Sequence, residues 1–199
     1  MPKKKAKPKS GGGRRGKSNL IDRLESAEAA AVLQRLLARH PELREEVEAL
    51  ARAVLGEVSL LDIADEVEGA LLQFDYDDLN SRAGAHSWGY MDPTEAAWEM
   101  LDEAVAPFIA DMKRHLELGL EEEARQCCQG ILLGLYRVRD GAGNDIVGWA
   151  ADFPAETAAQ VLKDWKKAGA RSAVSRDFVA EHVPDWDWVA ETTPGKARP

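Results

Sequence analysis

The chain's densest group of acidic, imidazole and aromatic side chains lies between positions 75 and 91. Carboxylates and an imidazole beside aromatic rings could bind a hard metal ion or a cationic peptide. A calcium-binding loop does not fit, because counting from Asp75 places Leu79 at the fifth position and His86 at the twelfth. The segment therefore either binds a partner or packs its rings on helices with its acids in water. The residues we predict to bind a protein or peptide partner are Asp75, Tyr76, Asp77, His86, Trp88 and Tyr90.

A run of basic residues opens the chain and could neutralise phosphate groups without a folded site. No aromatic residue is interleaved for base stacking, so the segment could equally be a solubilising tail or fold back on the acidic remainder. It supports the alternative hypothesis of an accessory nucleic-acid-binding protein. The residues that would contact nucleic acid are Lys3, Lys4, Lys5, Lys7, Lys9, Arg14, Arg15 and Lys17.

The cysteines and histidines show no catalytic or metal-binding pattern. Cys127 and Cys128 are adjacent in a helical stretch with no strand before it, and the histidines at 40, 115 and 182 are scattered. Adjacent helical side chains diverge by about 100°, so a disulfide between the cysteines would be strained. We expect no enzyme activity, no metal and no cofactor, and a reducing, cytoplasmic location.

The charge of the chain is strongly polarised. The total is −9, and subtracting the +8 of residues 1–17 leaves −17 for the remainder. A body this acidic repels phosphate backbones and anionic lipids at long range, so its partners are expected to be basic or neutral. No run of about 18 apolar residues could span a membrane, and 45% apolar residues are enough for one ordinary core.

Apolar residues recur at steps of three and four from about Leu20 to Trp188, which is typical of amphipathic helices. We expect these residues to face the core. The stripes that open the chain are Ala29, Leu33, Leu36 and Leu37, then Leu43, Val47, Leu50, Val54 and Leu55, then Leu60, Ile63, Val67, Leu71 and Phe74. The later stripes are Trp98, Leu101, Val105, Phe108, Met112 and Leu116, then Leu120, Ala124, Cys127, Ile131, Leu135 and Val138, then Ala158, Val161, Leu162 and Trp165.

Local signals predict where several helices begin and end. Ser26, Ser59 and Asp92 suit N-caps, and Gly119 suits a helix end. Pro107 predicts a kink or a break. We expect Phe153-Pro154 to end a short helix that begins at Ile146, and residues 75–91 to form a long loop. The pair Gly130 and Gly134 should allow a neighbouring backbone to approach closely.

No segment shows sustained β-type alternation, so the predicted class is all-α. Short turns between helices favour an αα-hairpin stack or a short right-handed α-solenoid of about seven helices. The predicted organisation is a disordered basic arm over 1–17, a helical domain over 18–190 and a disordered tail over 191–199.

The stretch Leu33-Gln-Arg-Leu-Leu-Ala-Arg-His-Pro-Glu-Leu43 resembles the opening of uncharacterised bacterial helical-repeat proteins. The resemblance extends through Phe108-Ile-Ala-Asp-Met-Lys-Arg-His-Leu-Glu-Leu-Gly119. Similar helical regions accompany SWIM-type zinc fingers. The CxC and CxH pairs of that zinc finger are absent from this sequence, so the resemblance implies no zinc site.

The leading hypothesis is a non-catalytic helical-repeat protein that binds a protein or peptide partner through one face and the 75–91 segment. Trp186 and Trp188 could also anchor a partner, or they could cap the end of the core. Leu36→Ala and Leu135→Ala should each cost about 2–5 kcal/mol if both leucines are buried.

Overall fold

The structure is a computed structural model that describes residues 19–87, 89–141, 145–170 and 174–191. It divides into two compact units, residues 1–50 (unit 1) and 51–199 (unit 2). The predicted basic arm and all but the first residue of the predicted tail lie outside the described residues, and the predicted domain limits of 18 and 190 stay predictions.

The prediction of an all-α class is confirmed. The described residues form ten α-helices and one two-stranded antiparallel sheet, against about seven helices expected. The short helices α4 and α10 are among those that were not expected. These two helices have seven and four residues, too few to show a helical period in the sequence.

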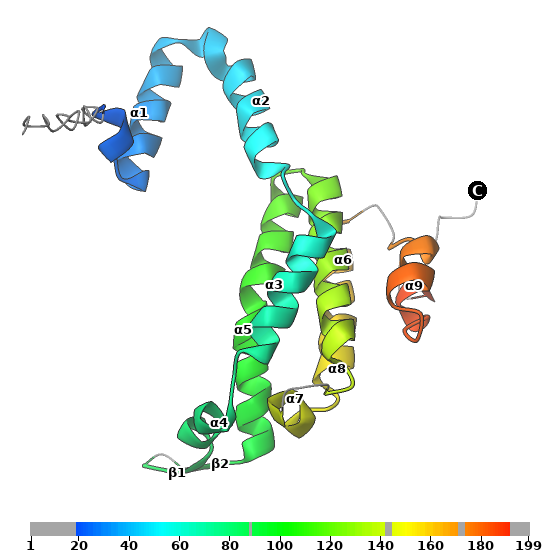
Figure 1. The fold of residues 1–199 in the computed structure, drawn as a ribbon. Helices are drawn as coiled ribbons and strands as arrows, with labels where there is room; N and C mark the ends of the chain where they lie inside the picture. Colours follow the sequence, from blue (N-terminus) through cyan, green and yellow to red (C-terminus); the bar gives the residue numbers. More distant parts are fainter. Residues whose placement is uncertain (1–18, 88, 142–144, 171–173, 192–199) are drawn as a thin grey trace, which may run out of the picture. The chain divides into compact units, whose positions relative to one another are not determined.

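Unit 1 contains two helices joined by a turn (Figure 1). A 3-10 turn at Ile21–Arg23 precedes α1 (Ser26–Arg39), and a second one at Pro41–Leu43 leads into α2 (Arg44–Leu55), whose last five residues belong to unit 2. The N-cap of α1 is Glu25 and not the predicted Ser26. Glu25 and Glu28 each accept a hydrogen bond from the other's backbone N–H, and this reciprocal pair fixes the helix start one residue earlier.

Unit 2 contains the remaining elements, which Figure 1 labels. The three long helices α3, α5 and α6 pack side by side, and α8 packs on α6 and α5. The elements are α3 (Leu60–Leu72), α4 (Tyr76–Arg82), β1 (Gly84–His86), β2 (Gly89–Met91), α5 (Pro93–Glu117), α6 (Glu121–Val138), α7 (Asp145–Trp149), α8 (Phe153–Lys167), α9 (Arg176–His182) and α10 (Trp188–Glu191).

Helix α6 forms the centre of unit 2, because α3, α5 and α8 all contact it. The predicted close approach at its two glycines is confirmed. A Cβ atom on Gly130 would lie 2.6 Å from the Cβ of Ile63, and one on Gly134 would lie 2.7 Å from the Cβ of Val67. Both distances are shorter than any real contact, so the two glycines set the spacing between α3 and α6.

Several predicted helix ends are confirmed. The Ser59 hydroxyl accepts from the Asp62 N–H, and the Asp92 carboxylate accepts from the Thr94 N–H, so both residues cap helices as expected. Gly119 follows α5 with a φ of 74°, a left-handed conformation that suits glycine.

Two predictions about proline need correction. Helix α5 continues through Pro107 without the break that was one of the two predicted outcomes, and the buried Val105 and Met112 pack it on both sides of the proline. The pair Phe153-Pro154 begins α8 and does not end α7. Proline suits a helix start because its missing N–H would have no partner there.

Hydrogen bonds to the carboxylate of Asp185 connect the carboxyl-terminal part of unit 2 to the end of α6. Its Oδ2 accepts hydrogen bonds from the Tyr136 hydroxyl at 2.7 Å and from Arg139 Nη2 at 2.9 Å. The ring of Trp186 is buried and stands edge-on to that of Tyr136, with centroids 5.3 Å apart. Trp186 therefore caps the core, as one of the two sequence alternatives proposed.

Candidate functional site

The predicted 75–91 loop is in fact folded, which corrects the prediction. Asp75 caps α4, since its Oδ1 accepts from the N–H groups of Asp77 and Asp78 at 2.8 and 3.0 Å. Asp78 Oδ2 accepts in return from the Asp75 N–H at 3.0 Å. A β-hairpin follows, in which Ala85 pairs with Tyr90. The acids of this segment therefore serve to start a helix.

The imidazole of His86 is also engaged in local structure. Its Nε2 lies 2.7 Å from the Arg82 carbonyl oxygen, so Nε2 carries the proton and donates it. Arg82 in turn places Nη2 at 3.0 and 2.8 Å from the two carboxylate oxygens of Glu103, which ties α4 to α5. These contacts join the β-hairpin to α4 and α4 to α5.

Of the predicted partner-binding residues, two tyrosines keep large exposed areas. Tyr76 is 50% exposed and Tyr90 is 69% exposed. Trp88 lies outside the described residues. The segment thus presents tyrosine rings to solvent, a residue type that is enriched at protein interfaces, while Asp75 and His86 are used within the fold.

Cys127 is a candidate nucleophile, because the fold places its thiol beside a histidine. Its Sγ lies 3.9 Å from Nδ1 of His115. That nitrogen also lies 2.8 Å from the Asp111 carbonyl oxygen, so its proton goes to the carbonyl and it has no lone pair for the thiol. Burial, with added repulsion from Asp111 and Glu123, raises the pKa of Cys127 to about 11. The thiol therefore stays protonated at neutral pH, which disfavours nucleophilic chemistry.

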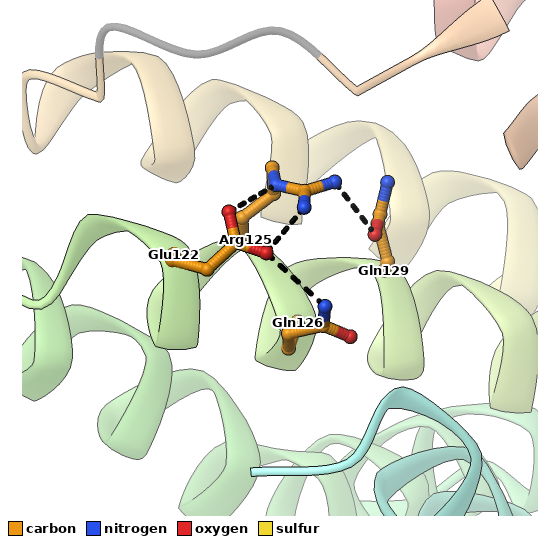
Figure 2. Close-up of polar contacts among 4 residues, drawn as sticks. All are labelled: Glu122, Arg125, Gln126 and Gln129. Carbon is orange, nitrogen blue, oxygen red and sulfur yellow. Dashed lines mark hydrogen bonds and ion pairs between the residues drawn. The ribbon is translucent and has the colours of Figure 1, made fainter. Parts of the chain in front are cut away.

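A polar network in the N-terminal half of α6 links four side chains of that helix (Figure 2). Arg125 forms a bidentate ion pair with Glu122 and donates from Nη1 to the buried Gln129 at 3.3 Å. Gln126 donates to the same carboxylate at 3.2 Å. The hydrogen bond from Arg125 is the main cause that lowers the pKa of Glu122. All of these bonds join residues three or four positions apart on one helix, so the network stabilises α6.

Three hollows in unit 2 have volumes of about 490, 420 and 370 Å³. The first lies on α9 and α10, and the other two lie between α5 and α8. In the second, Lys113 Nζ is 2.5 Å from Asp164, and this bond lowers the pKa of the carboxyl group. The first is lined by Arg176, Val179, Ala180, Pro184, Asp187 and Ala190. Among the described residues, no cluster of His, Cys, Asp and Glu could hold a metal ion.

The most unusual surface of the molecule is the apolar face of unit 1. The sequence assigned this stripe to the core, but none of residues 26–55, all of them described, is buried. Val32 is 51% exposed, Leu36 is 42% exposed and Leu50 is 60% exposed. The prediction failed because an apolar stripe shows which side of a helix tends to be buried, but not which element or partner buries it. We call this surface the hairpin face: Val32, Leu33, Leu36, Leu43, Val47 and Leu50.

Comparisons of the chain with protein-family models, with curated proteins and with solved structures gave no match. The resemblance to the helical regions beside SWIM-type zinc fingers therefore stays a prediction. No helix within the described ranges is both long and apolar enough to cross a membrane.

Proposed function

We propose that this chain is a non-catalytic helical protein that binds a protein partner through the hairpin face. The observation that carries the proposal is the exposure of leucine and valine side chains along both helices of unit 1. Exposed apolar patches on otherwise well-packed proteins mark interaction sites. The predicted hairpin-stack or solenoid arrangement and the cytoplasmic location belong to the same proposal.

The low stability expected for two short helices supports the proposal that they bind a partner. Helices α1 and α2 have 14 and 12 residues. Isolated helices shorter than about 12–15 residues are marginal in water, and most helical stability in proteins comes from packing an apolar face. Leu43 and Val47 of this face are half-buried, but no residue of either helix is fully buried, so a bound protein would supply further packing.

The 75–91 segment belongs to the proposal as a second, smaller contact. Its exposed rings, Tyr76 and Tyr90, could add to binding, whereas Asp75 and Asp77 lie at the capped start of α4 and His86 bonds to the backbone. Tyrosine supplies contact area at low cost in side-chain entropy. Binding that is unchanged by Tyr90→Ala would remove the segment from the interface.

Photo-crosslinking in living cells tests the main proposal. The photoreactive amino acid p-benzoylphenylalanine replaces Leu36 on the hairpin face and, as the control, Glu66, an exposed position on α3. A covalent protein adduct from position 36 and none from position 66 is the expected result. Equal adducts from both positions, or none from either, would refute a specific interface at the hairpin face.

The alternative proposal is nucleic-acid binding through Lys3 to Lys17, which lie outside the described residues. It is favoured by the +8 charge of residues 1–17. A mobility shift with duplex DNA compares the full chain with a chain that begins at Ser18. If all eight cations engage phosphates, the affinity of the full chain should fall with salt with a log-log slope of about 5–7. A salt-independent shift, or no shift, would dismiss this alternative.

A further inference from the structure

We propose that a hollow between α5 and α8 binds a basic side chain, lysine or arginine, of a partner protein. The hollow has a volume of about 370 Å³ and lies wholly within unit 2. Trp98, Asp102 and Ile109 line it from α5, and residues between Glu156 and Lys163 line it from α8. We call it the Trp98 hollow. The proposal does not depend on the hairpin face.

The ring of Trp98 offers a surface for a cation. Trp98 is half-buried, and its ring stands edge-on to that of Phe153, with centroids 5.0 Å apart and an interplanar angle of 72°. An edge-on contact covers at most one face of a ring, so the other face stays available. Tryptophan is the aromatic residue that attracts ammonium and guanidinium groups most strongly.

Two carboxylates lie on the same sides of the two helices as this ring. Asp102 follows Trp98 by four residues on α5, and Glu156 follows Phe153 by three on α8, spacings that place side chains together on a helix face. Both acids line the hollow and are exposed. Within the described part of the chain, neither side chain forms an ion pair or a hydrogen bond. A bound cation would supply the opposite charge.

A buried hydroxyl group in the same hollow has no partner. Thr157 is only 7% exposed and lines the hollow, yet its side chain makes no hydrogen bond to any described residue. Buried polar side chains are almost always hydrogen-bonded. The N–H groups of a bound ammonium or guanidinium would donate to Thr157 Oγ1, so this hydroxyl is independent evidence for a ligand.

The charges of the hollow are separated along its length. Lys163 follows Glu156 by seven residues, which is about 10 Å along α8, so the two acids and the tryptophan lie at the end away from the lysine. The next hollow along α5 and α8 is different, because Lys113 and Asp164 already pair with each other there. The end of the Trp98 hollow that holds Asp102 and Glu156 is therefore complementary to a cation.

An NMR titration of the purified full chain tests the proposal. The probes are N-acetyl-lysine methylamide and N-acetyl-arginine methylamide, and the neutral control is N-acetyl-norleucine methylamide. The indole N–H signal of Trp98 should shift saturably with both charged probes, and the neutral probe should bind at least about 10-fold more weakly. No shift at Trp98, or equal affinity for the neutral probe, would overturn the proposal.

Charge-removing variants test whether binding is local. Asp102→Asn with Glu156→Gln should raise the Kd of the lysine probe by about 10-fold. The matched control, Glu66→Gln with Glu99→Gln, removes the same charge from exposed positions that do not line the hollow, and should change the Kd by less than about 2-fold. Equal weakening by the two pairs would assign binding to the acidity of the whole body and reject the Trp98 hollow.

The variant Thr157→Val separates binding from folding. Valine has nearly the shape of threonine, and no hydrogen bond of a described residue is lost, so urea unfolding should show a stability at least equal to that of wild type. Affinity for the lysine probe should fall by about 3-fold or more, since the hydroxyl acceptor is gone. Unchanged affinity would reject Thr157 as a contact of the bound cation. These probes report on unit 2 alone, so their failure would leave the cross-linking test of the hairpin face unaffected.

Discussion

Leu36 and Leu135 have the same side chain in opposite surroundings. Leu36 is 42% exposed on α1, whereas Leu135 is fully buried in α6. Truncating a buried leucine removes contacts and leaves a cavity, which costs about 2–5 kcal/mol, while exposed sites usually change stability by under about 0.5 kcal/mol. The expectation of equal losses at both positions is therefore corrected for Leu36.

Urea unfolding monitored by tryptophan fluorescence checks this difference, because the tryptophans report on unit 2. We expect Leu135→Ala to lower the free energy of unfolding of unit 2 by about 2–5 kcal/mol and Leu36→Ala to leave it within about 0.5 kcal/mol of wild type. Similar losses for the two variants would mean that Leu36 is buried in the folded chain.

At the scale of elements, the glycines of α6 allow α3 to pack closely against it. A Cβ at position 134 would lie 2.7 Å from the Cβ of Val67 and 2.9 Å from the carbonyl oxygen of Ala64. The second contact is with backbone, so Gly134→Ala must push the two helices apart. Overpacking of this kind costs about 1–3 kcal/mol, which exceeds the gain of up to about 1 kcal/mol in helix propensity.

The control for this prediction is Gly69→Ala on α3. No atom lies within 4 Å of the Cβ that it would add. Only the propensity gain remains there, so Gly69→Ala should stabilise unit 2 by up to about 1 kcal/mol in the same urea experiment. Equal effects of the two substitutions would contradict the close packing of α3 on α6.

Helix boundaries were predictable where they depend on neighbouring residues alone. Ser59, Asp92 and Gly119 act through hydrogen bonds or backbone conformation within one turn, and each prediction is confirmed. The continuity of α5 through Pro107 was not predictable, because it depends on residues that only the tertiary fold brings against it. The short helix at Tyr76–Arg82 was missed because its reciprocal aspartate cap resembles a solvated acidic loop.

At the scale of the whole molecule, an ion pair joins α5 to α8. Lys113 Nζ lies 2.5 Å from the carboxylate of Asp164, and its hydrogen bond is the main cause that lowers the pKa of that carboxyl below its ordinary value of 3.8. A lowered pKa means that the folded state holds the proton less tightly than the unfolded state. The stabilisation is therefore complete above about pH 4 and is lost as the pH falls through the folded-state pKa.

The variant Asp164→Asn should show this dependence. It should be less stable than wild type at pH 7 by up to about 1 kcal/mol, since the lysine is partly in water, and the difference should shrink as the pH falls below the ordinary pKa of 3.8 and through the lower folded-state pKa. Thermal unfolding at a series of pH values measures the gap. A gap that persists unchanged into acid would assign it to packing and not to charge.

The candidate interface could be predicted only in part. The apolar residues of unit 1 were visible in the sequence, and so was their spacing, but Leu33 and Leu36 were assigned to the core because periodicity does not distinguish an internal neighbour from an external one. The exposed rings of Tyr76 and Tyr90 were predicted to be available, whereas the role of Asp75 as a cap required knowledge of the backbone.

Because α6 lies at the centre of unit 2, the core of this unit cannot be completed until α6 has been synthesised. Roughly 65 residues separate the end of α3 at Leu72 from the end of α6 at Val138. At about 5–20 residues per second, a ribosome needs roughly 3–13 s to make them. Throughout that interval the nascent α3, and then α5, have no α6 to pack against. A chain that stops before Val138 would lack part of the helix on which both α3 and α5 pack, and would leave apolar residues of those helices in water.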